Sequence, residues 1–166
     1  MLDYRRAIFA SIKKNQGCHF RDLERRMAIP ASTLKYHLNY MARKGIVQEK
    51  RSDNRICYFS GDIAEGDRAL LSLIRQESFR RIILCILERK EANQKSIREY
   101  TSLSSSSVSW YLKRLEESKV ITHEEANGEK YYKLLSNENS LMHLLITYKE
   151  SFLDKLVDRV VEMWDS

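Results

Sequence analysis

The 166-residue chain contains no long hydrophobic run. A helix that crosses a bilayer needs roughly 18 to 20 mainly apolar residues, and no segment approaches that length. Residues 1–6, Met-Leu-Asp-Tyr-Arg-Arg, also lack the apolar stretch of a secretory signal peptide. We therefore expect a cytoplasmic protein without a membrane partner.

Cysteine is scarce as well. The three cysteines, Cys18, Cys57 and Cys85, include no CxxC pair, and an odd, scattered set excludes a disulfide framework. The four histidines fall on different predicted elements, so the sequence shows no cluster of metal ligands. We expect the cysteines to be small buried hydrophobic residues and the protein to bind no metal.

The residue patterns of catalysis are also missing. The five glycines form no phosphate-binding loop, and neither a Ser, His and Asp set nor a pair of carboxylates occurs at an interpretable spacing. We predict that the protein is not an enzyme and uses no cofactor.

Positive charge is abundant and unevenly distributed. The net charge is +6, yet residues 1–62 hold thirteen Lys and Arg against six Asp and Glu, a net +7. Residues 63–136 hold thirteen against eleven, a net +2, and residues 137–166 hold three against six, a net −3. The N-terminal part is therefore expected to bind a polyanion.

The segment 31–44 has the pattern of a helix with two chemically different faces. Leu34, Leu38 and Met41 recur at helical spacing, and His37 beside them is predicted to be a partly buried packing histidine. The opposite face carries hydrogen-bond donors suited to phosphates and base edges, so we predict a DNA recognition helix; the alternative is a solvated polar face. The predicted DNA-binding residues on this helix are Ser32, Thr33, Lys35, Tyr36, Asn39 and Arg43.

The surrounding pattern supports that prediction. Helices are expected over 2–12 and 21–27, Pro30 suits the first turn of the next helix, and two β-rich runs, 46–50 and 56–59, flank a polar turn. This order resembles a winged helix-turn-helix domain of the ArsR/MarR type, on the residues Leu23, Ile29, Ser32, Thr33, Leu38, Gly45, Ile46 and Val47. The resemblance implies that the basic wing 50–55 contacts phosphates or the minor groove through Lys50, Arg51 and Arg55.

The same pattern recurs about 74 residues later. A shift of 74 places Ser32 on Ser106, Tyr36 on Trp110 and Leu38 on Leu112. The second copy has expected helices over 79–89, 95–100 and 105–118, and a hairpin that turns at Asn127-Gly128. Such repetition predicts two winged helices in tandem.

The second copy departs from the first in its wing. Its predicted DNA-facing residues are Ser106, Ser107, Ser109, Trp110, Lys113 and Arg114. Its wing, however, carries Glu124, Glu125 and Glu129, which would repel phosphates. The sequence leaves open whether this copy binds DNA or whether Trp110 faces a protein.

The C-terminal segment is predicted to be a long helix over 141–164. Its apolar arc widens in the later turns beyond what one neighbour can cover, which indicates a homodimer. The expected dimerisation residues are Phe152, Leu156, Val160 and Met163.

Together these features predict a mainly α fold with small β-hairpins (α+β). The expected domains are a winged helix-turn-helix over 1–62, a helical linker over 63–78, a second winged helix-turn-helix over 79–136 and a dimerisation helix over 137–166. The chain resembles the small tandem winged-helix regulators common in archaea, which implies a sequence-specific transcriptional regulator. Double-stranded DNA is its expected partner, with the transcription machinery as a further candidate. The alternative is a protein-protein assembly module, built of tandem winged helices, that does not recognise a DNA sequence.

Overall fold

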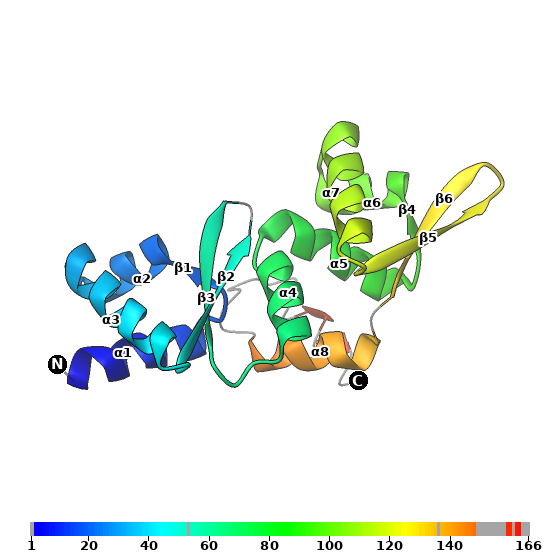
Figure 1. Ribbon diagram of the computed structural model, residues 1–166. Helices are drawn as coiled ribbons and strands as arrows, with labels where there is room; N and C mark the ends of the chain where they lie inside the picture. The colour runs from blue at the N-terminus through cyan, green and yellow to red at the C-terminus, as the bar shows by residue number, and fades with distance from the viewer. Residues whose placement is uncertain (1, 53, 136, 149–158, 161, 164–166) are drawn as a thin grey trace. The chain divides into compact units, whose positions relative to one another are not determined.

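The computed structural model describes residues 2–52, 54–135, 137–148, 159–160 and 162–163 (Figure 1). It divides into two compact units between residues 72 and 73, a point inside the segment 63–78. Among the described residues, no helix is long and apolar enough to cross a membrane.

The first unit contains three helices, a small sheet and most of a fourth helix. The elements are α1 (Leu2–Lys14), β1 (Cys18–His19), α2 (Phe20–Met27), α3 (Ala31–Arg43), β2 (Val47–Ser52) and β3 (Arg55–Ser60). The strands pair antiparallel in the order β1-β3-β2, so β2 and β3 form the wing and β1 ties it to the helices. Helix α4 (Glu65–Ile74) follows, and the division between the units falls within its last turn.

The core of this unit lies between α1, α2, α3 and the sheet. Leu34, Leu38 and Met41 are at most 1% exposed, which confirms the predicted apolar stripe of α3. They pack in one cluster with Ile8, Ile12, Leu23 and Val47. Because each such side chain contributes about 1.5 to 3 kcal/mol on burial, this cluster fixes which face of α3 remains outside.

The base of the wing is held at two points. The side chain of Gln16, two residues after the end of α1, donates to Ser60 Oγ at 2.6 Å and accepts from the Ser60 backbone N–H at 2.9 Å. Next to it, Gly61 passes so close to the chain at Gly45 that a Cβ added there would lie 2.3 Å from the Gly45 carbonyl oxygen. Only glycine fits this approach, because any larger residue would clash with the Gly45 backbone. The close contact therefore holds the end of β3 against the start of β2.

The second unit repeats this plan. Its elements are α5 (Glu77–Arg89), β4 (Ala92–Asn93), α6 (Gln94–Thr101), α7 (Ser105–Glu117), β5 (Ile121–Ala126), β6 (Glu129–Leu134) and α8 (Glu138–Thr147). The sheet order is β4-β6-β5, and Ile121 pairs with Leu134 as Val47 pairs with Ser60. The 74-residue repeat is thus kept in the strand register, and the predicted tandem winged-helix α+β fold is confirmed.

The tight turn of the second hairpin follows from two residues. Asn127 and Gly128 have φ of 54° and 76°. A two-residue hairpin turn whose twist matches that of the strands requires positive φ at both residues.

The C-terminal helix begins earlier than predicted. Asn137 caps α8 by accepting from the Asn139 backbone N–H at 2.9 Å, so the helix starts at Glu138 rather than Leu141. Helix α8 ends at Thr147, and residues 149–158 of the predicted helix 141–164 lie outside the described residues.

Candidate nucleic-acid interface

The outer face of α3 presents the side chains that the sequence assigned to DNA. Ser32, Lys35, Tyr36, Asn39 and Arg43 are exposed, and Thr33 is half-buried. The opposite stripe is buried in the core, so these side chains are left on the outer face of the helix. The helix therefore offers a polar, donor-rich ridge to solvent.

Beside this ridge lies a groove of about 800 Å³ between α2, α3 and the β2–β3 wing. Five cationic side chains line it against two carboxylates, those of Asp22 and Glu49. The cations are Arg21, Arg25, Lys35, Arg51 and Arg55. We call this feature the basic groove.

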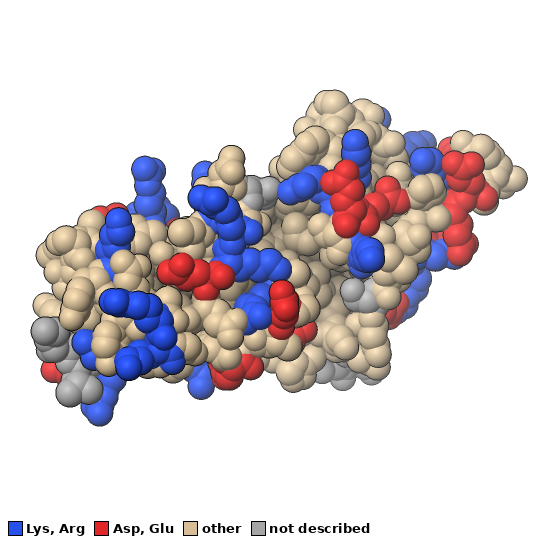
Figure 2. Space-filling model, in the orientation of Figure 1, with Lys and Arg blue, Asp and Glu red and all other residues tan. Residues whose placement is uncertain are grey.

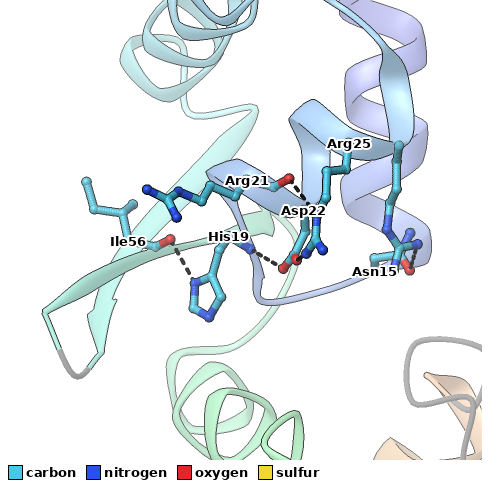
Figure 3. A network of polar contacts seen from close by, with 7 residues as sticks. Asn15, His19, Arg21, Asp22, Arg25 and Ile56 are labelled. Carbon is cyan, nitrogen blue, oxygen red and sulfur yellow. Dashed lines mark hydrogen bonds and ion pairs between the residues drawn. The ribbon is translucent and has the colours of Figure 1, made fainter.

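The sequence interpretation missed the part of the basic groove that α2 contributes (Figure 3). Asp22 accepts from the His19 backbone N–H at 3.1 Å and pairs with Arg25 at 2.8 Å. Nε of Arg25 also donates to the Arg21 carbonyl oxygen at 3.4 Å. The sequence pattern that could have predicted this contribution is the pair Arg21 and Arg25, which are four residues apart and hence lie on one face of the helix.

The wing residues divide between its two faces. Arg51 and Arg55 line the basic groove, whereas Lys50 does not. Since successive strand residues point to opposite faces, Lys50, opposite Cys57 in the ladder, lies on the other side of the hairpin from Arg51. Arg55, opposite Ser52, starts on the same side as Lys50 but lines the basic groove from its place beside the turn. The three predicted wing contacts therefore do not form one cluster.

The cations at the mouth of the basic groove are available to an anion. Lys35, Arg51 and Arg55 are exposed and form no ion pair with another described residue. Arg25, in contrast, is held by Asp22. An anionic backbone of spaced phosphates would complete this surface without breaking an existing ion pair.

His37 lies under the ridge, as predicted for a packing histidine. It is 2% exposed, and its Nδ1 has no hydrogen-bond partner among the described residues. Burial, with a smaller contribution from the nearby Arg5 charge, lowers the pKa of His37 below its usual 6.5. The imidazole is therefore neutral at pH 7.

The second domain has the same architecture, but the positions that match the basic groove are mostly acidic. The positions that correspond to the five cations of the basic groove, 74 residues later, hold Lys95, Glu99, Ser109, Glu125 and Glu129. On the face shown in Figure 2, acidic side chains gather on the β5–β6 hairpin, whereas basic ones gather over the β2–β3 wing. One cation and three carboxylates thus replace five cations, which disfavours phosphate at this place.

The second recognition-type helix also uses its hydroxyls internally. Ser104 caps α7 by accepting from the Ser107 backbone N–H at 3.2 Å, and Gln94 Nε2 donates to Ser109 Oγ at 2.7 Å. Ser106, Ser109, Trp110 and Lys113 are exposed, while Ser107 and Arg114 are half-buried. The Trp110 ring, 53% exposed, stands edge-to-face on Tyr111 at 5.0 Å.

Only two of the four predicted dimerisation residues lie among the described residues. Val160 is 3% exposed, and its neighbour Arg159 pairs with Glu88 at 2.9 Å and donates to the Tyr100 hydroxyl at 3.1 Å. Met163 is 60% exposed. Phe152 and Leu156 lie outside the described residues. Val160 is therefore buried within its own protomer. Of these two residues, only Met163 is exposed and could contact a second protomer.

Comparison with known proteins gives a match for each half of the chain. An N-terminal HTH domain family matches residues 2–71, and the winged helix-turn-helix DNA-binding family matches residues 75–122. An uncharacterised HTH-type transcriptional regulator of Methanocaldococcus jannaschii is 32% identical over 131 residues, or 78% of this chain. The chain spans about a third of that relative's length, 33%.

A solved structure gives a weaker match. It is that of Bordetella bronchiseptica BpsR, described for the regulation of its DNA binding by 6-hydroxynicotinic acid. It aligns over 80% of this chain and 93% of its own, at 10% identity and a TM-score of 0.37, and no conclusion about the fold follows from it. The two family matches, the repeated strand register and the exposed ridge of α3 together identify the chain as a tandem winged helix-turn-helix protein.

Proposed function

We propose that the protein is a sequence-specific, double-stranded DNA-binding transcriptional regulator that contacts DNA with its first domain. The observation that carries this proposal is the basic groove, which lies directly beside the donor-rich ridge of α3. Phosphate contacts position a protein on DNA and base contacts specify the sequence, and the first domain has a surface for each.

In this proposal α3 enters the major groove. Ser32, Tyr36 and Asn39 face the base edges, since hydroxyl, phenol and amide groups can donate to or accept from them. Arg51 and Arg55 follow the adjacent phosphates or enter the minor groove, as the wing does in this architecture. Arg21 on α2 extends the phosphate contacts across the basic groove.

Selection of bound duplexes from a random pool, followed by titration of the selected and an unrelated duplex at several salt concentrations, tests the proposal. A regulator enriches one motif and prefers it by about 10³-fold or more. Equal affinity for every duplex would reduce the protein to a non-specific polyanion binder.

A second candidate function concerns the second domain alone. The carboxylates at the positions of the basic groove (Glu99, Glu125 and Glu129) and the exposed Trp110 favour a protein-facing role, as in assembly modules built of tandem winged helices. The transcription machinery is one such partner. A regulator that binds DNA with one winged helix and protein with the other needs no catalytic site, and we propose that it is not an enzyme.

We further propose a homodimer held by the C-terminal segment, with an archaeal origin like that of the relative. A dimer with one DNA-binding domain per protomer favours an inverted repeat, its half-sites about one helical turn apart or a multiple of it. Sedimentation of the full chain at micromolar concentration tests the dimer, and a monomer would remove the argument for the inverted repeat.

A further inference from the structure

The first domain has a second hollow, on the other side of the α3 ridge from the basic groove. It measures about 360 Å³ and is lined by Tyr4, Ser32, Thr33, Tyr36 and His37. No lysine or arginine is among these lining residues, in contrast to the five in the basic groove. A hollow built of two phenol rings, an imidazole and two small hydroxyl side chains suits an apolar group with a polar neighbour, rather than a phosphate.

The exposed wall of this hollow is supported by ring contacts. Tyr36 is 51% exposed, and its ring stands on the His37 ring with centroids 5.2 Å apart and planes at 70°. Tyr4, from α1, packs on the same imidazole at 6.0 Å. An aromatic side chain has few rotatable bonds and therefore loses little conformational freedom when it meets a ligand.

The second domain repeats this arrangement at matching positions. Phe79 from α5 packs on Tyr111 at 4.8 Å, and Trp110 packs edge-to-face on Tyr111. Trp110 and Tyr36 are almost equally exposed, at 53% and 51%. Both domains therefore carry an exposed aromatic ring at the same turn of the helix, packed on the ring of the next residue.

His37 makes the floor of the hollow an uncharged surface. Its side chain is buried, and its Nδ1 has no partner among the described residues. A protonated imidazole would attract an anion, but the lowered pKa keeps the ring neutral at pH 7. The hollow thus combines aromatic walls with hydroxyl groups, and none of its lining residues is charged, although Arg5 lies near His37.

One kind of group in the major groove of DNA has matching chemistry. Thymine presents a methyl group on C5 beside the O4 acceptor, and 5-methylcytosine presents the same methyl group beside an amino donor. We propose that the Tyr4–Tyr36–His37 hollow binds the 5-methyl group of a pyrimidine, with a hydroxyl of Ser32 or Thr33 bonded to the adjacent polar atom. This inference rests on the proposed function and names the base edge that the first domain selects.

The test replaces each thymine of the selected duplex, one at a time, by deoxyuridine, which removes only the methyl group. Burying one methyl group corresponds to about a fourfold change in affinity, so we expect a loss of that size at one thymine in each half-site. In the Tyr36→Ala variant the thymine-to-uracil ratio at that position should fall to about one. Tyr36→Phe keeps the ring and should keep the ratio.

Two controls separate the outcomes. Arg51→Ala, in the basic groove, should weaken both duplexes equally and leave the ratio unchanged. Comparing cytosine with 5-methylcytosine at the same position identifies the source: a fourfold gain assigns the hollow to the methyl group of either base, and no gain restricts it to thymine. Equal binding of thymine and uracil duplexes at every position, or a ratio that persists in Tyr36→Ala, overturns the inference alone. A chain that binds no duplex refutes the proposed function together with it.

Discussion

The basic groove makes a quantitative prediction about salt. Arg51 and Arg55 are exposed, line the basic groove and have no ion pair with another described residue, so each is free to contact one phosphate. Each phosphate contact contributes about 0.9 to the slope of log affinity against log salt. The double variant Arg51→Ala, Arg55→Ala should therefore lower that slope by about two.

The same slope sets the loss of affinity. At about 0.1 M salt the loss of one phosphate contact lowers the binding affinity roughly eightfold. The double variant should therefore bind any duplex on the order of fifty-fold more weakly. Because phosphates carry no base identity, the preference for the selected site over random DNA should not change. Fluorescence anisotropy with both duplexes at four or five salt concentrations measures the slope and the preference together.

Lys50 provides the matched control. It is a cation on the same strand as Arg51, but it lies on the face of the wing away from the basic groove. Lys50→Ala should reduce the slope by much less than one. If Lys50→Ala flattens the salt dependence as much as Arg51→Ala, or if the arginine variants change sequence preference, the phosphates do not follow the basic groove.

Three further predictions concern the other domain, pH and the fold. Glu125→Lys in the second wing should leave the affinity for random DNA at low salt unchanged, and a tighter complex would place that wing against phosphates. The pKa of His37 is lowered in the folded state, so the unfolded chain binds the proton more readily; stability should be full above about pH 6.5 and fall as the pH drops below it, whereas His37→Asn should lose that dependence. Urea denaturation at several pH values measures this, and identical pH profiles for the two proteins would contradict it. Gly61→Ala should destabilise the first domain by about 1 to 3 kcal/mol, since its Cβ would meet the Gly45 carbonyl oxygen. Gly66→Ala, in α4 with open space around it, should instead stabilise by about 0.5 to 1 kcal/mol, and urea denaturation curves in which both variants shift the same way would refute the close approach at Gly61.

The features that could be predicted from sequence are those that depend on local periodicity. The stripe of Leu34, Leu38 and Met41 is buried because its spacing matches the helical repeat. The turn at Asn127-Gly128 forms because these two residues tolerate positive φ. The tandem fold is predictable because the stripe recurs 74 residues later as Val108, Leu112 and Leu115.

The composition of the basic groove could not be derived in the same way. Arg21 belongs to it because α2 packs beside the wing, which is a tertiary relation that no local pattern records. The separation of Arg51 from Lys50 follows from strand alternation, yet the side on which the helices lie depends on how the hairpin packs. The helical spacing of Val160 predicts that it is buried, but spacing alone does not show whether the same protomer or a second one buries it. In the structure Val160 is buried within its own protomer.

The central claim is that α3 recognises sequence while the basic groove holds the backbone. The most direct measurement is selection from a random duplex pool at about 0.1 M salt, carried out in parallel with the wild-type chain, Asn39→Ala and the double variant Arg51→Ala, Arg55→Ala. The wild-type chain should enrich one motif, the groove variant should enrich the same motif with a lower yield, and Asn39→Ala should lose preference at particular positions of it. A motif that survives intact in Asn39→Ala but changes in the groove variant would contradict the claim.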